Sequence, residues 1–386
     1  MIHFDFLSEG ARGALFHHAP KAVDASSDLA LQAMHLGATL YCPATRLQLV
    51  QDIVRSRARG VSSMVLCLED SVPNDQLAEA EDNLVHQLQQ LHEEGGAIPR
   101  LFVRVRAVEQ IGDLAARIGS AMPLISGFVL PKFTADVGRR YLDALDEAAR
   151  SSGVELLAMP VIESAEVMHL ESRVRALESI RELLCERRER VLAVRVGASD
   201  FSGIYGLRRS GETTVYDVRV VSNAIAEVVN VLGRADSTGF TITGPVWEYF
   251  ASGERIFKPR LRSSVFAEHG VLQLRQSLLL RDLDGLIREI ELDKANGLVG
   301  KTVIHPSHVA AVHALSVVTH EEFADATDVL GAVSPGGVLR SEYGNKMNEV
   351  NPHRAWAQKV LLRAHAFGVA GSDVSFVDLL AAGAET

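Results

Sequence analysis

Residues 63–105 read SMVLCLEDSVPNDQLAEAEDNLVHQLQQLHEEGGAIPRLFVRV, in which two short apolar runs flank one long amphipathic stretch. The apolar run Ser63–Leu68 is typical of a strand that is covered on both faces. In Gln76–Glu94 the leucines fall on one helical face, which predicts an amphipathic helix. Leu101–Val105 is a second apolar run. The stretch therefore predicts one strand–helix–strand unit.

The same alternation continues along the whole chain. Eight short apolar runs follow one another at Thr39–Cys42, Ser63–Leu68, Leu101–Val105, Phe128–Leu130, Leu157–Ile162, Val191–Val196, Phe240–Thr243 and Thr302–Ile304. Amphipathic stretches such as Arg46–Arg59, Arg219–Leu232 and Leu283–Ala295 lie between them and predict helices. Eight such units in order predict an α/β fold, a (β/α)8 TIM barrel. The rival is a doubly wound sheet, but the chain lacks GxGxxG after the first run and lacks GxxxxGK[ST].

Three parts of the chain exceed a minimal barrel. Residues 1–38 have weak periodicity and are expected to form an N-terminal extension around the barrel base. Residues 39–318 are expected to form the barrel domain, with an insertion at about 254–281, after the seventh strand, that covers or reshapes the pocket. Residues 319–386 are expected to form a helical segment or lid, with a helix near Trp356–Phe367.

Composition excludes several classes of protein. The 386 residues carry 39 Lys and Arg against 49 Asp and Glu, a net charge of −10, which argues against a nucleic-acid partner. No apolar run is long enough to span a membrane, and residues 1–20 lack the pattern of a signal peptide. Cys42, Cys67 and Cys185 are far apart and without CxxC spacing, so we expect reduced thiols in a cytoplasmic protein.

Charged side chains follow most of the predicted strands. The active site of a TIM barrel is built at the carboxyl ends of its strands, so these residues are expected to meet on one rim. They are Arg46, Glu69, Asp70, Arg104, Arg106, Lys132, Glu163, Asp200 and His305. Acids and bases that converge from separate strands are what a magnesium-and-carboxylate site requires.

This set predicts a specific chemistry. Glu163 and Asp200 can supply the one or two carboxylates that Mg²⁺ usually takes from a protein. A 2-oxo acid can complete the coordination, and the metal then polarises its carbonyl for carbon–carbon bond cleavage or formation. Arg104 can hold the substrate carboxylate through a bidentate fork, and Glu69 and Asp70 can orient metal-bound waters and the arginine.

Structural roles remain open for the same residues. Asp70 can be a turn residue, and Asp200 can cap the helix that follows it. Arg104 lies inside an apolar strand and can form a buried ion pair. Among other chemistries, the sequence contains no HExxH motif for a histidine-bound metal and no GxSxG motif for a serine hydrolase.

Taken in order, the motifs resemble the HpcH/HpaI aldolase and citrate lyase family, in the branch of the citrate lyase beta subunit and malyl-CoA lyase. The motifs that carry the resemblance are Pro43–Arg46, Leu68–Pro73, Val103–Val105, Val129–Lys132, Val161–Ser164, Gly197–Phe201 and Ile304–Pro306. The resemblance implies a magnesium-dependent barrel that makes or breaks the bond between an acetyl-CoA-type enolate and a 2-oxo acid. It implies Glu163 and Asp200 as metal ligands and Arg104 on the substrate carboxylate. It further implies Glu69 and Asp70 near the metal waters, and Arg46 and Lys132 near substrate or coenzyme phosphates.

Two departures from the family pattern carry further expectations. The family has an aspartate two residues after a methionine in its C-terminal segment, whereas here Glu349 stands at that spacing after Met347. By analogy Glu349 is an acid/base candidate supplied to a neighbouring subunit, in a homo-oligomer such as a trimer. Arg106 stands where the family has asparagine, which indicates a more anionic or differently shaped substrate.

The sequence therefore predicts a magnesium-dependent carbon–carbon lyase acting on a hydroxy-acyl substrate, with or without coenzyme A, or on a 2-oxo acid in the reverse direction. Two alternatives stay open. One is a class II pyruvate-type aldolase that uses no coenzyme A. The other is a ligand-binding barrel that has lost turnover.

Overall fold

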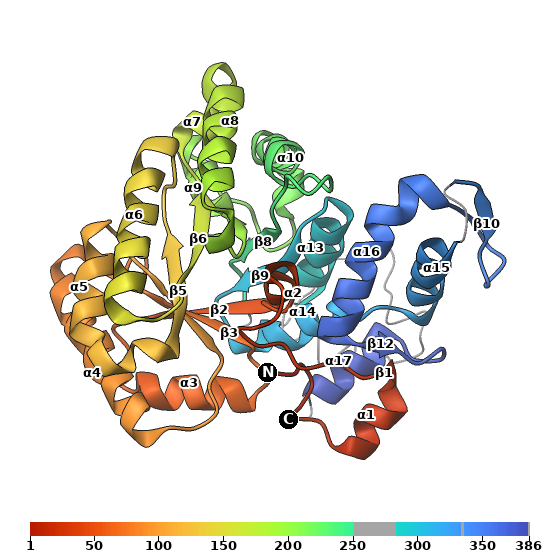
Figure 1. Cartoon of the computed structure of the whole chain (residues 1–386), viewed down its shortest axis with the longest axis horizontal. Coiled ribbons are helices and arrows are strands. Elements are labelled where there is room, and N and C mark those ends of the chain that lie inside the picture. The colour runs from red at the N-terminus through yellow and green to blue at the C-terminus, as the bar shows by residue number, and fades with distance from the viewer. Residues whose placement is uncertain (251–282, 333–335, 385–386) are drawn as a thin grey trace.

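The barrel predicted from the sequence is present. The computed structural model describes residues 1–250, 283–332 and 336–384, and eight parallel strands close into a barrel in chain order (Figure 1). The strands are β2 (Ala38–Pro43), β3 (Ser63–Cys67), β4 (Arg100–Arg104), β5 (Ile125–Leu130), β6 (Leu157–Ile162), β7 (Val194–Val196), β8 (Ile242–Trp247) and β9 (Val299–Val303). Pairing of Ala38 in β2 with Lys301 in β9 completes the cylinder.

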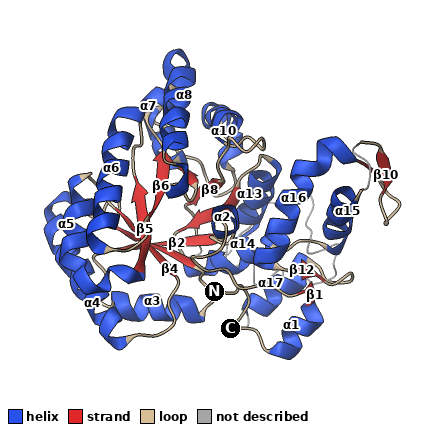
Figure 2. Cartoon of the chain, in the orientation of Figure 1, coloured by secondary structure: helices blue, strands red, loops and turns tan. Residues whose placement is uncertain are grey.

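Helices cover the outside of the barrel, as Figure 2 shows. The longer ones are α3 (Leu49–Ala58), α4 (Leu77–Glu94), α5 (Glu109–Ile118), α6 (Ala135–Ser152), α8 (Leu170–Glu186), α10 (Arg219–Leu232), α13 (Leu283–Ala295) and α14 (Val309–Ser316). The observed α10 and α13 have the predicted bounds. In α4 the face that carries Leu84, Leu88 and Leu91 is buried, which is the face that the leucine spacing indicated.

The seventh barrel strand differs from the prediction. The sequence predicts a strand at Phe240–Thr243 that ends before Gly244-Pro245, whereas β8 runs through both residues to Trp247. The register of β8 against β9 shifts on either side of Gly244. Proline cannot donate to a regular ladder but fits at such a bulge, and the strand therefore continues. The prediction placed the rim about four residues too early.

A buried arginine fills part of the barrel interior. The guanidinium of Arg195, in β7, donates to the hydroxyls of Thr302 (2.5 Å) and Thr39 (3.5 Å). It also lies over the ring of Tyr41, 5.4 Å from the ring centroid. Burial lowers the pKa of Arg195. The cation is retained because hydroxyls and an aromatic face replace part of its hydration.

The N-terminal extension lies against the base of the barrel. It contains α1 (Glu9–Leu15), β1 (Phe16–His18) and α2 (Leu29–Met34). Ala33, in α2, and Leu36 pack with the residues that fill the barrel interior, and His3 stacks on Phe367 from the C-terminal segment, with 4.2 Å between ring centroids. Residues from both ends of the chain therefore share one core at this end of the barrel.

Three histidines meet in this core. The ring of His3 lies 4.2 Å from that of His35 and 4.5 Å from that of His313, centroid to centroid. The backbone N–H of Ala38 donates to Nε2 of His313, which must therefore be unprotonated at that nitrogen. Gly37 (φ +56°) makes the approach possible, because a Cβ there would lie 2.7 Å from the same Nε2.

We expect acid to weaken the fold through these histidines. Burial lowers the pKa of His35 to about 3, and burial also holds the pKa values of His3 and His313 well below their usual value. Below the unfolded-state pKa the unfolded chain binds more protons, so stability falls as the pH falls. Between pH 7 and pH 5, His35 alone should remove about 2 kcal/mol from the free energy of unfolding.

Urea titrations at pH 7 and pH 5 measure this effect. The variant His35→Phe should show a shallower dependence on pH, and His92→Gln, at an exposed histidine in the last turn of α4, should show the wild-type dependence. An equal slope for wild type and His35→Phe would contradict the assignment.

The C-terminal segment lies beside the barrel, on the right of Figure 1, and Phe367, Val377 and Leu380 belong to the same hydrophobic core as barrel residues. Its elements are α15 (His320–Gly331), β10 (Val338–Arg340), β11 (Met347–Glu349), α16 (Val350–Phe367), β12 (Val369–Ala370) and α17 (Phe376–Ala384). The helix predicted near Trp356–Phe367 is the second half of α16. β12 pairs with β1, which joins the segment to the N-terminal extension.

Three further predictions concern an insertion, membrane-spanning helices and the cysteines. The predicted insertion at about 254–281 lies outside the described residues. Within the described parts of the chain, no helix combines the length and apolar character that crossing a bilayer needs. Cys42, Cys67 and Cys185 are free thiols.

Candidate functional site

Five of the predicted charged residues meet at the carboxyl ends of β3 to β6. Nη2 of Arg104 lies 2.7 Å from Oε2 of Glu69, 3.1 Å from Oε1 of Glu163 and 3.3 Å from Oδ2 of Asp70. Nζ of Lys132 lies 2.8 Å from Oε1 of Glu69. Three carboxylates and two cations from four successive strand ends therefore form one ion-pair network, called here the rim cluster.

The backbone positions Glu163 from two sides. Lys132 has φ +48°, an uncommon conformation for a residue with a side chain, and its N–H donates to Oε1 of Glu163 at 2.8 Å. On the other side, a Cβ on Gly197 would lie 2.2 Å from Oε2 of Glu163. The strained backbone at Lys132 and the absence of a Cβ at Gly197 together fix the position of the Glu163 carboxylate.

The members of the rim cluster differ in exposure. The Glu163 side chain is 1% exposed and that of Glu69 is 4% exposed, whereas Asp70 and Lys132 are 56% and 60% exposed. Glu69 and Glu163 therefore form the floor of the site, and Asp70 and Lys132 face the solvent from which a substrate arrives.

The pKa values of the three carboxyl groups are shifted differently by their surroundings. Burial raises the pKa of Glu163 to about 8 against the attraction of Arg104, and the nearby charge of Asp200 adds to the rise. Partial burial and the hydrogen bond and charge of Glu69 raise the pKa of Asp70 to about 6. Burial also acts to raise the pKa of Glu69, but hydrogen bonds from Asp70 and Lys132 and the Arg104 charge hold it below its usual value.

Asp200 faces the same rim from α9 (Ala198–Ile204), the short helix after β7. Its charge acts on Glu163, Asp70 and Lys132, which places it beside the rim cluster. Among the described residues, no group of three or more His, Cys, Asp or Glu side chains is arranged to hold a metal. Two carboxylates with open positions for water and substrate are nevertheless a usual magnesium donor set, so Glu163 and Asp200 fit this ion.

Substitution of Gly197 tests how closely this carboxylate is held. Gly197→Ala puts a methyl group where Glu163 now lies, and a displacement of about 1 Å within an active site is expected to lower activity about 100-fold. The matched control is Gly203→Ala in α9, where an added Cβ meets nothing within 4 Å. Steady-state kinetics should show the loss in the first variant only, and equal activities would mean that Glu163 is not held in this way.

Four other predicted residues lie outside the rim cluster, and one of them, His305, stacks on Phe250 with 4.9 Å between ring centroids. Arg46 is exposed and pairs with Asp52 at 2.8 Å. Arg106 donates to the carbonyl oxygens of Glu69 (2.7 Å) and Val72 (2.5 Å), so it holds the loop that carries two of the acids. Glu349 is an exposed residue of β11, in the C-terminal segment, and its N–H donates to Nδ1 of His353.

A polar group that the sequence did not predict lies beside Asp200. Glu248 directly follows the true end of β8 and accepts a hydrogen bond from Ser199 at 2.8 Å. Arg209 pairs with the same carboxylate (3.4 Å) and with the buried Glu289. The signal in the sequence is that Glu248 directly follows the apolar pair Val246-Trp247. Gly244-Pro245 hides this signal, because it predicts that the strand ends earlier.

Three solved structures illustrate what this chain is similar to. CitE from Mycobacterium tuberculosis, in complex with magnesium, acetoacetate and coenzyme A, matches with 21% identity and a TM-score of 0.52 over 85% of this chain and 97% of that chain. A citrate lyase from Burkholderia xenovorans matches with 16% identity and a TM-score of 0.61 over 89% and 96%. Haloferax volcanii malate synthase, in a ternary complex with pyruvate and acetyl-CoA, matches with 13% identity and a TM-score of 0.52 over 85% and 89%. At these identities the likeness shows the fold.

The sequence itself shows the family. No curated protein matches it. The family model of carbon–carbon bond lyases of the TIM-barrel fold, however, matches residues 30–369, which include every barrel strand and the rim cluster. The family expected from the motifs is thereby confirmed at this level, and the chain belongs to the carbon–carbon bond lyases of the TIM-barrel fold.

Proposed function

We propose that this protein is a magnesium-dependent lyase that cleaves or forms the bond between an acyl-CoA-like enolate and a 2-oxo acid. The observation that carries the proposal is the rim cluster, in which one arginine is held by three carboxylates at the catalytic end of a barrel. Such an arrangement keeps a guanidinium in a fixed orientation before substrate binds, which is the condition for electrostatic stabilisation of a developing anion.

Arg104 is the proposed binding group for the substrate carboxylate. Its Nη2 is occupied by the three acids, but its buried Nε has no hydrogen-bond partner among the described residues. An unpaired buried donor of a charged group is costly, and a substrate carboxylate would satisfy it. The planar fork of arginine also fixes the orientation of the bound acid.

Glu163 and Asp200 are the proposed magnesium ligands. When bound, magnesium would act as a Lewis acid on the oxo group of the substrate. A cation beside these two carboxylates also offsets the burial and mutual repulsion that raise the pKa of Glu163. Glu69, with its hydrogen bonds from Lys132 and Asp70, would orient waters on the same side.

Asp70 is the proposed proton-transfer group in this chain. It is half-exposed toward the solvent, and a pKa of about 6 lies near the working pH of a general acid or base. In the cleavage direction it would accept the hydroxyl proton of a 3-hydroxyacyl substrate that carries a carboxylate on the same carbon. The C2–C3 bond would break, the hydroxyl carbon would become the oxo group of the 2-oxo acid, and the acyl fragment would leave as an enolate. The Nζ of Lys132 lies 4.0 Å from this carboxylate and would bind an anionic group of the substrate.

Coenzyme A, oligomerisation and Glu349 belong to the same proposal. CitE and malate synthase, described above, were solved with coenzyme A and with acetyl-CoA. Glu349 lies in β11, which pairs with β10, and Figure 1 shows β10 at the right edge of the molecule, away from the barrel strands β5 and β6. We propose that Glu349 serves a neighbouring copy in a homo-oligomer, such as a trimer. Arg46, exposed on the loop after β2, is the proposed contact for coenzyme phosphates.

A turnover panel tests the proposed function. Purified protein is mixed with 3-carboxy-3-hydroxyacyl-CoA thioesters, with the corresponding free hydroxy acids or with 4-hydroxy-2-oxo acids, and the 2-oxo acid product is separated and identified as its hydrazone. We expect product only from the thioesters, loss of activity with EDTA, and recovery when Mg²⁺ is added back. Product from free hydroxy-oxo acids would favour a pyruvate-type aldolase, and ligand binding without turnover would favour a non-catalytic barrel.

A further inference from the structure

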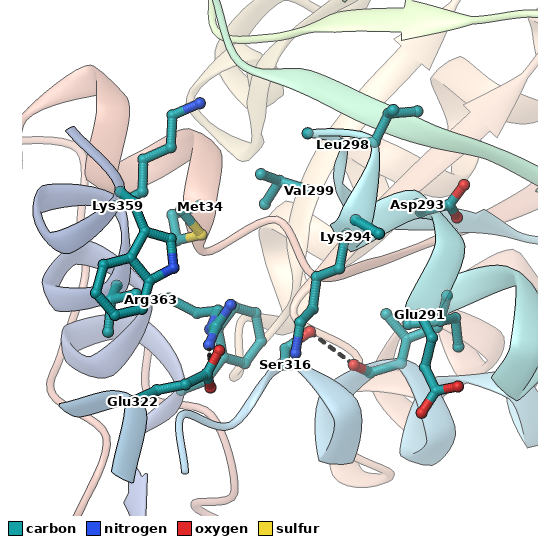
Figure 3. A pocket seen from close by; sticks show the side chains of 18 residues that line it. Met34, Glu291, Asp293, Lys294, Leu298, Val299, Ser316, Glu322, Lys359 and Arg363 are labelled. Carbon is teal, nitrogen blue, oxygen red and sulfur yellow. Dashed lines mark hydrogen bonds and ion pairs between the residues drawn. The ribbon is translucent and has the colours of Figure 1, made fainter. Parts of the chain in front are cut away.

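A second cavity lies at the opposite end of the barrel from the rim cluster. Its volume is about 550 Å³, and it lies between the C-terminal end of α13 with the start of β9 on one side and α16 on the other (Figure 3). In a barrel the helix-to-strand loops are at the amino ends of the strands, whereas the rim cluster is at the carboxyl ends. The cavity is therefore separate from the proposed active site.

The walls of the cavity combine apolar and aromatic side chains. They include Met34, Val299, Val312, Trp356, Val360 and Phe367. A volume of this size and a largely apolar lining are typical of sites for small organic molecules. The apolar residues come from the barrel, from the N-terminal extension and from the C-terminal segment.

Two cations turn into this space. In Figure 3 the side chain of Lys294 reaches from α13 toward Ser316, and Arg363 reaches from α16 toward Glu322. Nη2 of Arg363 lies 2.6 Å from Oε2 of Glu322, but its buried Nε has no partner among the described residues. The Nζ of Lys294 has one long contact, 3.5 Å to the carbonyl of Leu315.

Three acids line the cavity, but they offset only part of this charge, because Lys359 adds a third cation and the Glu291 carboxylate points away from the space between Lys294 and Arg363 in Figure 3. Asp293 lines the cavity, but its carboxylate is engaged by Lys301 at 2.6 Å and by the hydroxyl of Tyr216 at 2.8 Å. Glu322 offsets one of the two inward cations. Burial and then the charge of Arg363 lower the pKa of Lys294, so the two cations repel each other across the space.

From this geometry we propose that the cavity binds a small organic anion with an apolar body, such as an aromatic carboxylate or a phosphate monoester. The anionic head would lie between Nζ of Lys294 and Nε of Arg363, where it relieves their repulsion and satisfies the unpaired donor. The apolar body would pack against Trp356 and Phe367. The site is independent of the proposed function, because none of its residues belongs to the rim cluster.

Binding here would join two parts of the molecule. Lys294 belongs to the barrel and Arg363 to the C-terminal segment, so one anion contacts both. A ligand that binds only this folded arrangement stabilises it by mass action. We therefore expect the melting temperature to rise with ligand concentration, and proteolysis within residues 319–386 to slow.

Phenyl phosphate and phenylacetate are suitable probes, and inorganic phosphate and phenol serve as the separate halves of phenyl phosphate. The chain has two tryptophans, and Trp247 is fully buried in β8, so ligand in the cavity should change the fluorescence of Trp356. Calorimetry should show binding of at least one intact anion, with both halves binding at least tenfold more weakly. The probe with the lower Kd shows whether the cavity prefers a phosphate or a carboxylate head group.

Variants distinguish the cavity from other sites. Lys294→Gln should raise the Kd about tenfold, the loss of one charge-assisted contact. Lys21→Gln, at an exposed lysine that does not line the cavity, should bind as wild type, and so should Lys132→Gln in the rim cluster. Trp356→Phe should bind without the fluorescence change.

Four results would overturn the proposal. Neither intact anion binds, or inorganic phosphate binds as tightly as phenyl phosphate, which would indicate an adventitious ion only. Lys294→Gln binds as tightly as wild type, or Lys132→Gln alone loses binding, which would move the ligand to the catalytic end. Activity on the thioester panel does not enter any of these readouts, so this proposal and the proposed function fail separately.

Discussion

Glu163→Gln and Asp200→Asn should each lower turnover at least about 1,000-fold while the protein stays folded. Both changes keep the shape of the side chain and remove its charge, and a metal that stabilises transition-state charge is worth several kcal/mol. Titration calorimetry should show weaker Mg²⁺ binding in both variants. Steady-state kinetics at saturating Mg²⁺ measures the residual rate.

The fold should tolerate these two changes. Glu163 is buried with a raised pKa, so a neutral amide suits its surroundings, and Asp200 is only partly buried. The matched control is Glu166→Gln, at an exposed acid three residues further along. Wild-type turnover in either Glu163→Gln or Asp200→Asn would remove the proposed metal site, and a collapsed melting temperature would instead indicate a structural role.

Arg104→Lys is expected to lower kcat/KM about 1,000-fold, although the positive charge is kept. Lysine has a single ammonium on a flexible stem, so it cannot be held by three carboxylates and also bind a substrate carboxylate in a planar fork. A loss of this size corresponds to about 4 kcal/mol of transition-state stabilisation. Initial rates over a range of substrate concentrations separate kcat from KM.

The same strand provides the control. Arg100 lies at the opposite end of β4, where it donates to Oε1 of Gln32 at 2.9 Å, and Arg100→Lys should keep wild-type kinetics. In Arg104→Ala, guanidinium added to the buffer should restore part of the rate, because the space of the side chain is then open. Equal kinetics for Arg104→Lys and wild type would show that the fork is not used.

Much of the fold was predictable because it rests on local patterns. A strand covered on both faces needs a continuous apolar run, as in Leu157–Ile162, and a helix on a barrel needs one apolar stripe, as in α10. The strand at β8 was misplaced because Gly244-Pro245 is a turn signal in isolation. Only pairing with β9 allows the bulge that carries the chain through it.

The site was predictable to the level of its rim. Charged residues at the ends of successive strands must meet once the barrel closes, and Glu69, Arg104, Lys132 and Glu163 do so. Arg106 carries the same charge two residues after Arg104, yet it turns to the backbone of the loop before it. Strand periodicity predicts the face on which a side chain lies, but it does not predict which group a long arginine contacts beyond the end of the strand.

The periodicity of the chain predicts the barrel and the end of it at which acids and bases gather, and the motifs after the strands carry the resemblance to its family. Packing between distant segments set which cation each acid holds, the strained backbone at Lys132, and the space at Gly197 that Glu163 occupies. It also decided the second cavity, whose walls come from residues 34 to 367. Contacts between distant segments depend on how helices pack, and packing is settled by the shapes of many side chains at once.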